Sequence, residues 1–448
     1  MQTREKLKII LKEWAERETF RMYQRNFDPS LLKGDEIVSI IGARRSGKTC
    51  LCYQIIQELG KTLPKDNIAY INLEDERLSP FRGDELTLLW EVYQELFSPD
   101  LNKKMYFFVD EIQNAKNWSK WARRIAEQNK NLKLIITGSS SKLLSKEIAT
   151  ELRGRTLSAT IYPLSFSEYL KAKNVSYKIQ DILYSRQRIP VKKEFNNYLT
   201  LGGFPATIEA GKPKELLNEY YKVMFYRDLA DRYKIKNVKL LEDYLNLTID
   251  QTSCHCSISS TAAKLSEFGY SLSKNTLSNF SRYAQDIFLI FEVKRYSYKL
   301  KEQLRFPKKI YAIDHGLVQA IRFSFSEDRG RLLENIVFLN LKRQQDGIYY
   351  HKNSKECDFL TVKNGKVTQA IQVAQDLGSS KTRKREMEGL LEALGQYQLR
   401  NGLILTEDEY ETVKVANKTI RILPIWFWLL SSGTGDPGIR SVGNIRAF

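Results

Sequence analysis

A chain of 448 residues is too long for one hydrophobic core, so we expect it to divide into about two to four domains. Hydrophobic residues at 42% and charged residues at 28% are ordinary for a soluble globular protein. The longest apolar run, Ile422–Leu430, is too short for a membrane-spanning helix, which argues against a membrane partner. The formal charge of +18 favours a polyanionic partner such as nucleic acid, although a solvated basic surface would produce the same excess.

The five cysteines show no paired spacing, which predicts reduced thiols and a cytoplasmic location. The run Cys254–Cys256, with a histidine at its centre, suggests a metal site, but no second pair of ligands follows at zinc-finger spacing. The N-terminus mixes lysine and glutamate without an apolar segment and does not resemble a signal peptide. It predicts an amphipathic helix with an apolar stripe of Leu7, Ile10, Leu11 and Trp14.

The first 160 residues or so alternate apolar strands with helical stretches, a pattern typical of a parallel sheet covered by helices on both faces. The predicted strands are Ile37–Ile41, Ile68–Leu73, Tyr106–Val109 and Leu134–Thr137, and the predicted helices are Leu51–Leu59, Leu86–Phe97 and Trp118–Glu127. The fold class predicted for this part is therefore α/β.

The rest of the chain changes character several times. Residues 163–250 are predicted to be mainly helical, with a turn at Gly202–Pro205, and short helices then precede a basic, β-rich stretch up to about residue 320. A mixed pattern of helices and strands begins beyond residue 330, and the glycine- and serine-rich end predicts a flexible tail. The predicted domain limits are 1–162, 163–250, 251–322, 323–430 and the tail 431–448.

A phosphate-binding loop is predicted where the first strand ends. Residues Gly42–Thr49 match G-x-x-x-x-G-K-[ST], with a strand before them and a helical pattern after them. Glycines let backbone amides approach phosphate, Lys48 should reach the β- and γ-phosphates, and the Thr49 hydroxyl should bind Mg²⁺. The predicted nucleotide-binding residues are Gly42, Ala43, Arg44, Arg45, Ser46, Gly47, Lys48, Thr49 and Cys50.

Two acids follow the strand that begins at Tyr106, at the sheet edge where the phosphates should lie. Asp110 is predicted to hold Mg²⁺ through water, and Glu111 to orient and polarise the attacking water. The second acid is what separates hydrolysis of a nucleotide from binding alone. The same pair could instead cap the next helix.

Further polar residues are candidates for the same site. Thr137 or Ser139, at the end of another apolar strand, could sense the γ-phosphate or hold the attacking water, or they could be turn and N-cap residues. Arg153 and Arg155 could stabilise charge on the transferred phosphoryl group of a neighbouring subunit in a homo-oligomer. A surface salt bridge is the alternative for these arginines.

Longer runs of the sequence resemble a known family. GARRSGKT, YFFVDEIQN, ITGSSSKLLSKEIATELRGR and YPLSFSEYL resemble the archaeal-type P-loop ATPases of the AAA+ group. GGFP, FYRDLADRYKIKN, KKIYAIDHGL, ECDFL and IQVAQDL resemble the uncharacterised domain that commonly follows this ATPase module. The resemblance covers about residues 20–430 and implies an AAA+-like core, a winged-helix segment and a domain like the PD-(D/E)XK nucleases. It also implies ATP as the nucleotide, and it places the family's nucleotide and metal roles on Gly42, Gly47, Lys48, Thr49, Asp110 and Glu111.

Residues 257–300 show the pattern of a winged helix. Ser259 or Ser260 is predicted to cap its first helix, which Gly269 ends, and a second helix, Lys274–Tyr283, turns Leu277 and Phe280 inward. Basic and aromatic residues alternate after it, as in nucleic-acid-binding segments, although winged helices also serve as protein-binding modules or lids. The predicted nucleic-acid contacts are Lys274, Asn275, Ser278, Asn279, Arg282, Lys294 and Arg295.

A nuclease of the resembled type needs a helix Glu, a strand Asp and a Glu-x-Lys on the next strand. Glu334 and Asp358 occupy the first two positions, but Gln372 and Ala374 stand where the Glu and Lys should be. Gln is a weaker Mg²⁺ ligand than a carboxylate, and Ala cannot position water. The sequence therefore predicts a degenerate nuclease-like fold, unless Lys381 or Lys384 supplies the missing amine.

Together these features predict a Mg²⁺-dependent ATPase that acts with nucleic acid, DNA rather than RNA. The alternatives are a switch in which the ATP state controls protein partners, and a nuclease gated by ATP.

Overall fold

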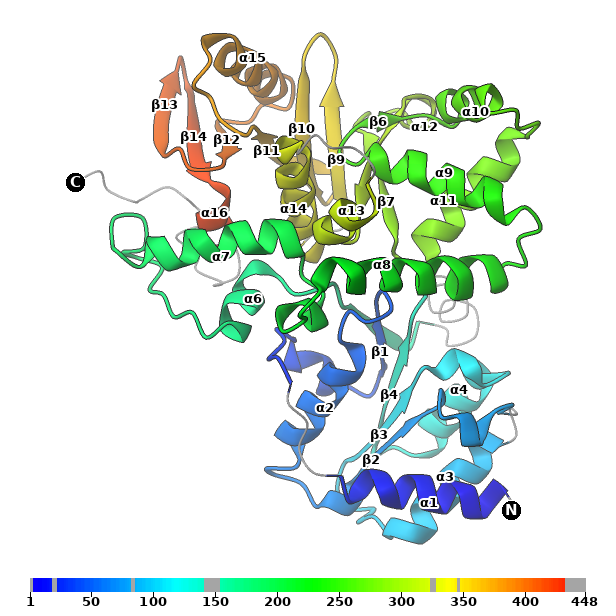
Figure 1. Cartoon of the computed structure of the whole chain (residues 1–448). Coiled ribbons are helices and arrows are strands. Elements are labelled where there is room, and N and C mark those ends of the chain that lie inside the picture. Colours follow the sequence, from blue (N-terminus) through cyan, green and yellow to red (C-terminus); the bar gives the residue numbers. More distant parts are fainter. Residues whose placement is uncertain are drawn as a thin grey trace. The chain divides into compact units, whose positions relative to one another are not determined.

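The computed structural model describes residues 3–17, 22–81, 85–140, 154–322, 328–344 and 347–431. The chain divides into two compact units, which are described separately. The first comprises Met1–Tyr162 with Asp286–Phe288, and the second comprises Pro163–Gln285 with Leu289–Phe448. Figure 1 labels their helices and strands.

The first unit is built on a parallel sheet of five strands in the order β2-β3-β4-β1-β5. Its strands are β1 (Ile37–Ile41), β2 (Ile68–Asn72), β3 (Met105–Asp110), β4 (Leu132–Gly138) and β5 (Thr156–Thr160). Its described helices are α1 (Thr3–Ala15), η1 (Pro29–Leu32), α2 (Lys48–Leu59), η2 (Lys65–Asn67), η3 (Glu76–Leu78), α3 (Glu85–Phe97), η4 (Ile112–Asn114) and α4 (Trp118–Gln128). All the strands and helices predicted before residue 140 are confirmed, with small differences at their ends.

Each face of this sheet carries its own hydrophobic core because successive strand side chains point to opposite faces. Phe107 packs on one face with residues of α1, α3 and α4, whereas Phe108 packs on the other face with residues of α2. Leu7, Ile10 and Leu11 of α1 are buried, as the predicted apolar stripe requires. Figure 1 shows α2 on one side of the sheet and α3 and α4 on the other.

Strand β5 was not predicted from the sequence. It lies at the sheet edge beside β1, and its residues are exposed or half-buried. Because its side chains lie largely outside the core, β5 lacks the apolar run by which the other four strands are recognised in the sequence.

The second unit begins with helices, as predicted for residues 163–250. These are α6 (Phe166–Ala172), α7 (Arg188–Leu201), η5 (Pro205–Ile208), α8 (Pro213–Val223), the π-helix η6 (Met224–Asp231) and α9 (Val238–Asp250). The helices that follow are α10 (Ile258–Glu267), α11 (Lys274–Asp286), α12 (Leu300–Arg305), α13 (His315–Ile321), α14 (Arg329–Gln344), α15 (Ser380–Gln396) and α16 (Ile425–Ser431).

A mixed sheet of nine strands runs through the second unit in the order β13-β14-β12-β11-β10-β9-β7-β8-β6. Its strands are β6 (His255–Cys256), β7 (Ile290–Arg295), β8 (Lys308–Ala312), β9 (Gly347–Lys352), β10 (Glu356–Lys363), β11 (Lys366–Val373), β12 (Asn401–Thr406), β13 (Glu411–Val415) and β14 (Lys418–Pro424). The parallel pairing of β7 with β9 joins the segment before residue 322 to the segment after it. The domain limit predicted between residues 322 and 323 therefore falls within one sheet, and the other limits stay predictions.

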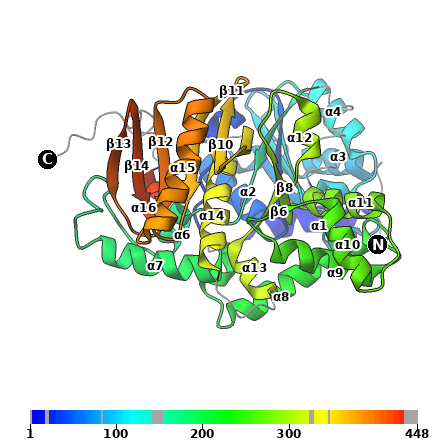
Figure 2. The ribbon, with the colours of Figure 1, turned by 90° about the horizontal axis from the view of Figure 1, so that it is seen from above.

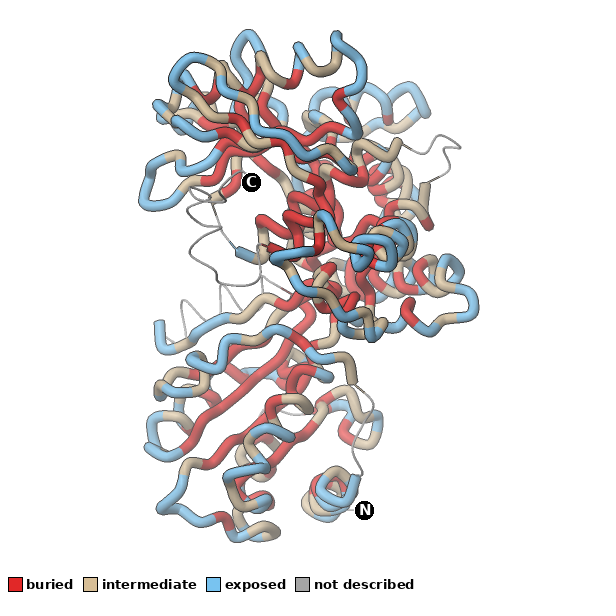
Figure 3. The backbone as a smooth tube through the Cα atoms, turned by 90° about the vertical axis from the view of Figure 1, so that its left-hand side faces the viewer, coloured by how far each residue is buried: buried red, intermediate tan, exposed pale blue. Residues whose placement is uncertain are grey.

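The faces of this sheet are covered by α14 and α15. Helix α15 packs on β10, β11 and β12, and Figure 2 shows it beside these strands. The middle of helix α14, Leu332–Leu341, is buried apart from the half-buried Glu334, and most of these residues are apolar. Figure 3 shows the buried residues in the interior of each unit and the exposed residues at its periphery.

Among the residues that the structure describes, no helix is long and apolar enough to cross a membrane. The predicted tail, apart from Ser431 at the end of α16, lies outside the described residues.

Candidate active site

The loop between β1 and α2 has two positions that need glycine. Gly42 has a φ of +155°, and a Cβ atom there would lie 2.1 Å from the carbonyl oxygen of Ile161. Gly47 has a φ of 100° and is the N-cap of α2. The turn therefore requires both glycines of the motif. It leads into a helix N-terminus, where unpaired amides and the helix dipole favour phosphate.

Lys48 lies buried inside this loop, with 4% of the residue exposed. Its Nζ donates to the carbonyl oxygens of Gly42 and Ala43, at 3.2 Å each, and lies 3.7 Å from Glu111 Oε1. The buried Ser46 Oγ has no hydrogen-bond partner among the described residues. A buried ammonium and an orphaned hydroxyl in one loop fit a phosphate chain, which can accept hydrogen bonds from both.

Arg25 holds the phosphate loop in place through hydrogen bonds. No sequence motif identified this arginine. Its guanidinium donates to the carbonyl oxygens of Ser46, at 2.6 Å, and Tyr162, at 2.7 Å, and the residue is 6% exposed. Its backbone pairs in both directions with the side chain of Gln54 on α2. Arg25 thus ties the loop and its helix to the end of the unit.

Asp110 ends β3 in a fully buried position. Its Oδ2 accepts hydrogen bonds from Thr49 Oγ1 at 2.6 Å and from the Tyr70 hydroxyl at 2.7 Å, and its Oδ1 accepts one from the Thr137 hydroxyl. Burial and the neighbouring Glu111 raise the pKa of Asp110, and the hydroxyl donors oppose that rise. Mg²⁺ prefers oxygen ligands such as the carboxylate and threonine hydroxyl that meet here, so the residues fit this ion.

Glu111 follows in a left-handed backbone conformation, with φ 54° and ψ 48°. Such a conformation is uncommon for a residue other than glycine and marks a constrained position. The Glu111 backbone N–H donates to Thr137 Oγ1 at 3.0 Å, which holds the turn, and its carboxylate accepts a hydrogen bond from the Gln113 side chain. The turn keeps the carboxylate next to Lys48.

Strand β4 lies between β1 and β3, so its carboxyl end faces both halves of the site. Thr137 links Asp110 to the backbone of Glu111 through one hydroxyl. Ser139 is buried, and its Oγ lies 3.5 Å from Nε2 of Gln113. Both residues were candidates from the sequence. The hydrogen bonds by which Thr137 connects Asp110 and Glu111 were not predicted.

The other residues of the predicted loop lie nearer the surface. Arg44 donates to Glu74 Oε1 at 3.1 Å, Arg45 is exposed with a φ of 64°, and Cys50 is exposed in the first turn of α2. Glu74 follows β2, at the same edge of the sheet as the loop.

One of the two candidate arginines lies among the described residues. Arg153 lies outside the described residues. Arg155 precedes β5, and its Nη1 lies 2.5 Å from Glu127 Oε1 with 64% of the side chain exposed. This ion pair is the surface contact that the sequence left open as an alternative.

The winged-helix candidates lie in the second unit. Helix α10 is capped by Ser257, not by Ser259 or Ser260 as predicted, because Ser257 Oγ accepts from Ser260 N while Ser260 Oγ accepts from Ser257 N. On α11, Leu277 and Phe280 are buried as predicted. The residues predicted to face outward from α11 are all exposed: Lys274, Asn275, Ser278, Asn279 and Arg282.

The basic, β-rich stretch predicted after α11 forms two strands, β7 and β8, with the helix α12 between them. Residues Leu300–Arg305 form α12 instead of continuing a strand, because the Ser297 hydroxyl accepts from Lys299 N and turns the chain. Lys294 is half-buried, and the Arg295 guanidinium lies 3.9 Å from the centre of the Phe306 ring. Arg295 therefore already has an aromatic partner within the unit.

The nuclease-like candidates converge on an amine that the sequence did not reveal. Lys309 of β8 is 2% exposed, and its Nζ lies 3.1 Å from Glu334 Oε1, 2.9 Å from Glu356 Oε1 and 2.7 Å from Asp358 Oδ1. The Tyr311 hydroxyl also donates to Glu334 Oε1, at 2.6 Å. Burial raises the pKa of Glu334, and Lys309 opposes that rise. We call Lys309, Glu334, Glu356 and Asp358 the lysine cluster.

Gln372 supports this cluster through hydrogen bonds. Its Oε1 accepts from Asp358 N at 3.2 Å, and its Nε2 donates to the carboxylate of Glu386. Lys381 and Lys384, the amines proposed from the sequence, are exposed on α15, so that proposal was wrong. The ammonium of Lys309 lies where the carboxylates meet, and these residues therefore do not fit the divalent cation of a PD-(D/E)XK nuclease.

The Cys254–Cys256 run does not form a metal site with its neighbours. His255 Nε2 lies 3.0 Å from Glu356 Oε1, and Cys256 Sγ lies 3.2 Å from the Thr261 hydroxyl. In the described part of the chain, no group of three or more His, Cys, Asp or Glu residues could hold a metal ion.

The parallel sheet, the glycine loop before α2 and the acids at the end of β3 define a P-loop nucleoside triphosphatase domain. Residues 34–170 match the family model of an AAA domain. This match classifies the P-loop domain as an ATPase domain of the AAA type. Residues 192–328 match a domain of unknown function.

Curated relatives share nearly the whole chain. The uncharacterized protein MJ1544 of Methanocaldococcus jannaschii is 38% identical over 412 residues, which cover 89% of this chain and 89% of that protein. An uncharacterized protein of Haemophilus influenzae is 29% identical over 405 residues, which cover 88% of this chain and 94% of that protein. The chain therefore belongs to the same family as MJ1544.

Solved structures were also matched at low similarity. The structure of Drosophila ORC bound to DNA has a TM-score of 0.26 and 15% identity, covering 63% of this chain and 88% of that chain. The structure of AMPPCP-bound DnaA from Aquifex aeolicus has a TM-score of 0.26 and 13% identity, covering 55% of this chain and 81% of that chain. TM-scores of this size carry no conclusion about this chain.

Proposed function

We propose that the protein is a Mg²⁺-dependent ATPase whose turnover is linked to nucleic acid bound by its second unit. The observation that carries the first part is the 2.6 Å contact between Thr49 Oγ1 and Asp110 Oδ2, with Glu111 and Lys48 beside it. This contact brings the two predicted metal ligands together at the mouth of the phosphate loop. Thr49 and Asp110 would hold Mg²⁺, which would offset the negative charge of the phosphates.

The side chains of the site divide the work of hydrolysis. The loop amides and Lys48 bind the phosphates, and Lys48 neutralises charge that grows on the leaving group. Glu111, 7% exposed and held by its left-handed backbone turn, orients the attacking water and accepts its proton. Thr137 positions both acids through one hydroxyl. Arg153 and Arg155 remain candidates to act on the γ-phosphate of a neighbouring copy.

The phosphate-loop role is tested with Lys48→Ala in the full-length protein. Calorimetric titration with ATP and MgCl₂ should show binding at least about a hundredfold weaker, because an amine bonded to two oxyanions is lost from a buried site. Lys61→Ala, at an exposed position just after α2, is the matched control and should bind ATP normally. Unchanged ATP affinity in Lys48→Ala would refute the role.

Nucleic-acid binding is supported by the exposed polar face of α11 and by the excess of basic residues. Lys274 and Arg282 supply charge on this face, and Asn275, Ser278 and Asn279 supply side chains that can reach base edges or phosphates. The formal charge of +18 would attract a polyanion over the whole chain. Duplex DNA is the form to which a helix of this kind is suited.

This part is tested by fluorescence anisotropy with a labelled DNA duplex in increasing salt. Binding should weaken steeply with salt, and Lys274→Ala/Arg282→Ala should reduce the slope of log K against log salt by about two. The control is Lys381→Ala/Lys384→Ala, which removes the same charge from exposed sites on α15. This variant should leave the contact between DNA and α11 intact. If neither DNA nor RNA binds or changes ATP turnover, the regulatory switch becomes the better explanation.

A further inference from the structure

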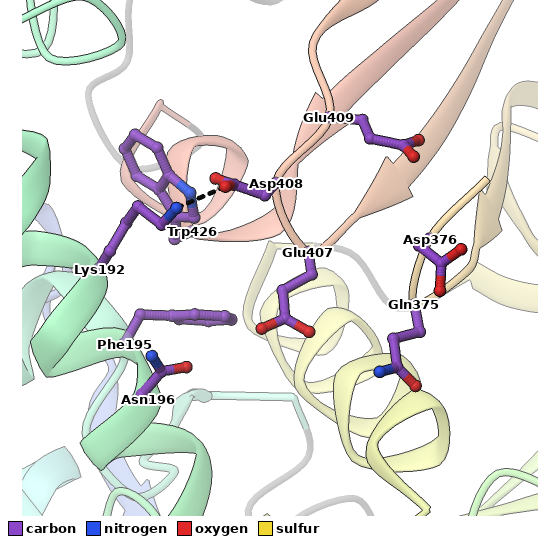
Figure 4. A pocket seen from close by; sticks show the side chains of 9 residues that line it. All are labelled: Lys192, Phe195, Asn196, Gln375, Asp376, Glu407, Asp408, Glu409 and Trp426. Atoms are coloured by element: carbon purple, nitrogen blue, oxygen red, sulfur yellow. Dashed lines mark hydrogen bonds and ion pairs between the residues drawn. The ribbon is translucent and has the colours of Figure 1, made fainter. Parts of the chain in front are cut away.

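The second unit contains a pocket of about 250 Å³ that is remote in sequence from the phosphate loop. Figure 4 shows the side chains around it: they come from α7, from the loops after β11 and β12, and from α16. Neither the ATPase site nor the lysine cluster contributes a residue to it. It is formed entirely within the second unit.

The pocket lies where ligands usually bind in sheets of this kind. Strands β11, β12 and β14 are neighbours and run parallel. The chain leaves β11 toward Gln375 and Asp376, leaves β12 toward Glu407–Glu409, and leaves β14 toward Trp426. The carboxyl ends of parallel strands open into loops that diverge, which leaves room for a ligand.

The charge of the pocket is unbalanced. Asp376, Glu407, Asp408 and Glu409 line it, and Lys192 of α7 pairs with Asp408. Arg329 binds both carboxylate oxygens of Glu407, at 2.8 and 2.5 Å.

Among the described residues, the other two acids accept hydrogen bonds only from backbone N–H groups. Asp376 accepts from Gly378 N at 3.0 Å, and Glu409 Oε1 accepts from Leu377 N at 2.9 Å. Glu409 Oε2 has no hydrogen-bond partner among the described residues. Two carboxylates without a basic partner in the contacts that line this pocket favour a cationic ligand.

The opposite side of the pocket offers a hydrogen-bond donor. Trp426 is 2% exposed and lines the pocket, and its indole Nε1–H has no partner in the described part of the chain. A buried indole N–H normally finds an acceptor, so its position calls for an acceptor on the ligand. The rings of Trp426 and of the buried Phe195 add apolar surface to the lining of the pocket.

We propose that this pocket binds a small organic ligand with a cation at one end and a hydrogen-bond acceptor at the other, the chemistry of a basic amino acid. The cationic end lies toward Asp376 and Glu409, and the acceptor end lies toward Trp426 Nε1 and Lys192. A volume of about 250 Å³ suits a molecule of this size. The proposal is independent of the ATPase function, because it rests on residues of the second unit alone.

The test is calorimetric titration of the full-length protein with L-arginine and with L-citrulline, which has the same shape and a neutral side chain. L-Arginine should bind saturably, and L-citrulline should bind at least about tenfold more weakly because one charged contact is lost. Putrescine, a cation without an acceptor, should also bind more weakly than L-arginine. Equal binding of citrulline, or no saturable binding of L-arginine up to ~10 mM, overturns the proposal.

Two variants locate the binding. Glu409→Gln keeps the shape of the side chain and should weaken L-arginine binding about tenfold, and Trp426→Phe should weaken L-arginine but not putrescine. Glu411→Gln, exposed on β13 outside the pocket, is the matched control. If Glu409→Gln fails to fold by circular dichroism, Asp376→Asn at an exposed position gives the same readout. Undiminished binding in the folded variant overturns the assignment.

Discussion

Replacement of Lys309 by Met is the sharpest test of the interpretation of the second unit. Met has a similar length but no charge, so it removes the ammonium and fills most of the same space. The carboxylates of Glu334, Glu356 and Asp358 all lie within 3.1 Å of the Lys309 amine. Glu356 keeps Lys352, at 3.0 Å, as a second basic partner, so Glu334 and Asp358 bear the loss.

The expected magnitude follows from the burial of the cluster. Lys309 is 2% exposed and Asp358 is 6% exposed, so water cannot screen the acids that remain. Breaking a buried pair by removal of one partner costs about 3–5 kcal/mol of unfolding free energy, because an uncompensated charge is left in place. Lys308→Met is the control on the same strand: Lys308 is 31% exposed in the side chain, and loss of its ion pair with Glu292 should cost less than about 1 kcal/mol.

The assay is urea unfolding of the full-length protein followed by far-ultraviolet circular dichroism. Lys309→Met should move the transition of the second unit to lower urea with little change in slope. Neutralising both acids in Lys309→Met/Glu334→Gln/Asp358→Asn should recover most of the loss, since the desolvated charges are then gone. The reasoning is refuted if Lys309→Met unfolds at the same urea concentration as Lys308→Met, or if the triple variant is no more stable than Lys309→Met.

Four further outcomes test the active site and the cluster. Glu111→Gln should keep ATP affinity within about threefold but lower turnover by about a hundredfold or more in single-turnover assays, and normal turnover would count against it as the base. Thr137→Val should lower turnover by about tenfold or more, since it frees both acids at once; an unaltered rate would show that the link is dispensable. If Arg155 acts in a neighbouring copy, mixtures of Lys48→Ala and Arg155→Ala should regain some ATPase activity that neither variant has alone. No recovery at any mixing ratio would argue against a shared site. Burial raises the pKa of Glu334 in the folded state, so the contribution of Glu334 to stability is complete below its unfolded pKa and is lost as pH rises through its folded pKa. Glu334→Gln should therefore flatten this loss of stability when urea midpoints are measured across pH. An identical pH profile in the variant and the original protein would contradict this role of Glu334.

Local sequence was enough to predict the phosphate loop, the two acids and four of the five strands of the first unit. The loop at Gly42–Thr49 and the acids Asp110 and Glu111 lie directly after apolar strands. Parallel strands bring their carboxyl ends to one edge, so residues that follow different strands meet without any further information. This is why the 2.6 Å contact between Thr49 and Asp110 could be anticipated from motifs 61 residues apart.

The tertiary structure alone decided which residues complete each site. Tyr70, Arg25 and Lys309 carry no motif, and each contacts its site through pairing or packing with segments distant in sequence. Lys309 follows Lys308 in β8 and would be taken for a surface lysine, but the fold brings Glu334 of α14 and two acids of β10 to its amine. The pocket beside Trp426 likewise exists only because three strands and α7 are brought together. Motifs record chemistry that is local in the chain, whereas charge compensation and cavities depend on which segments the fold makes neighbours.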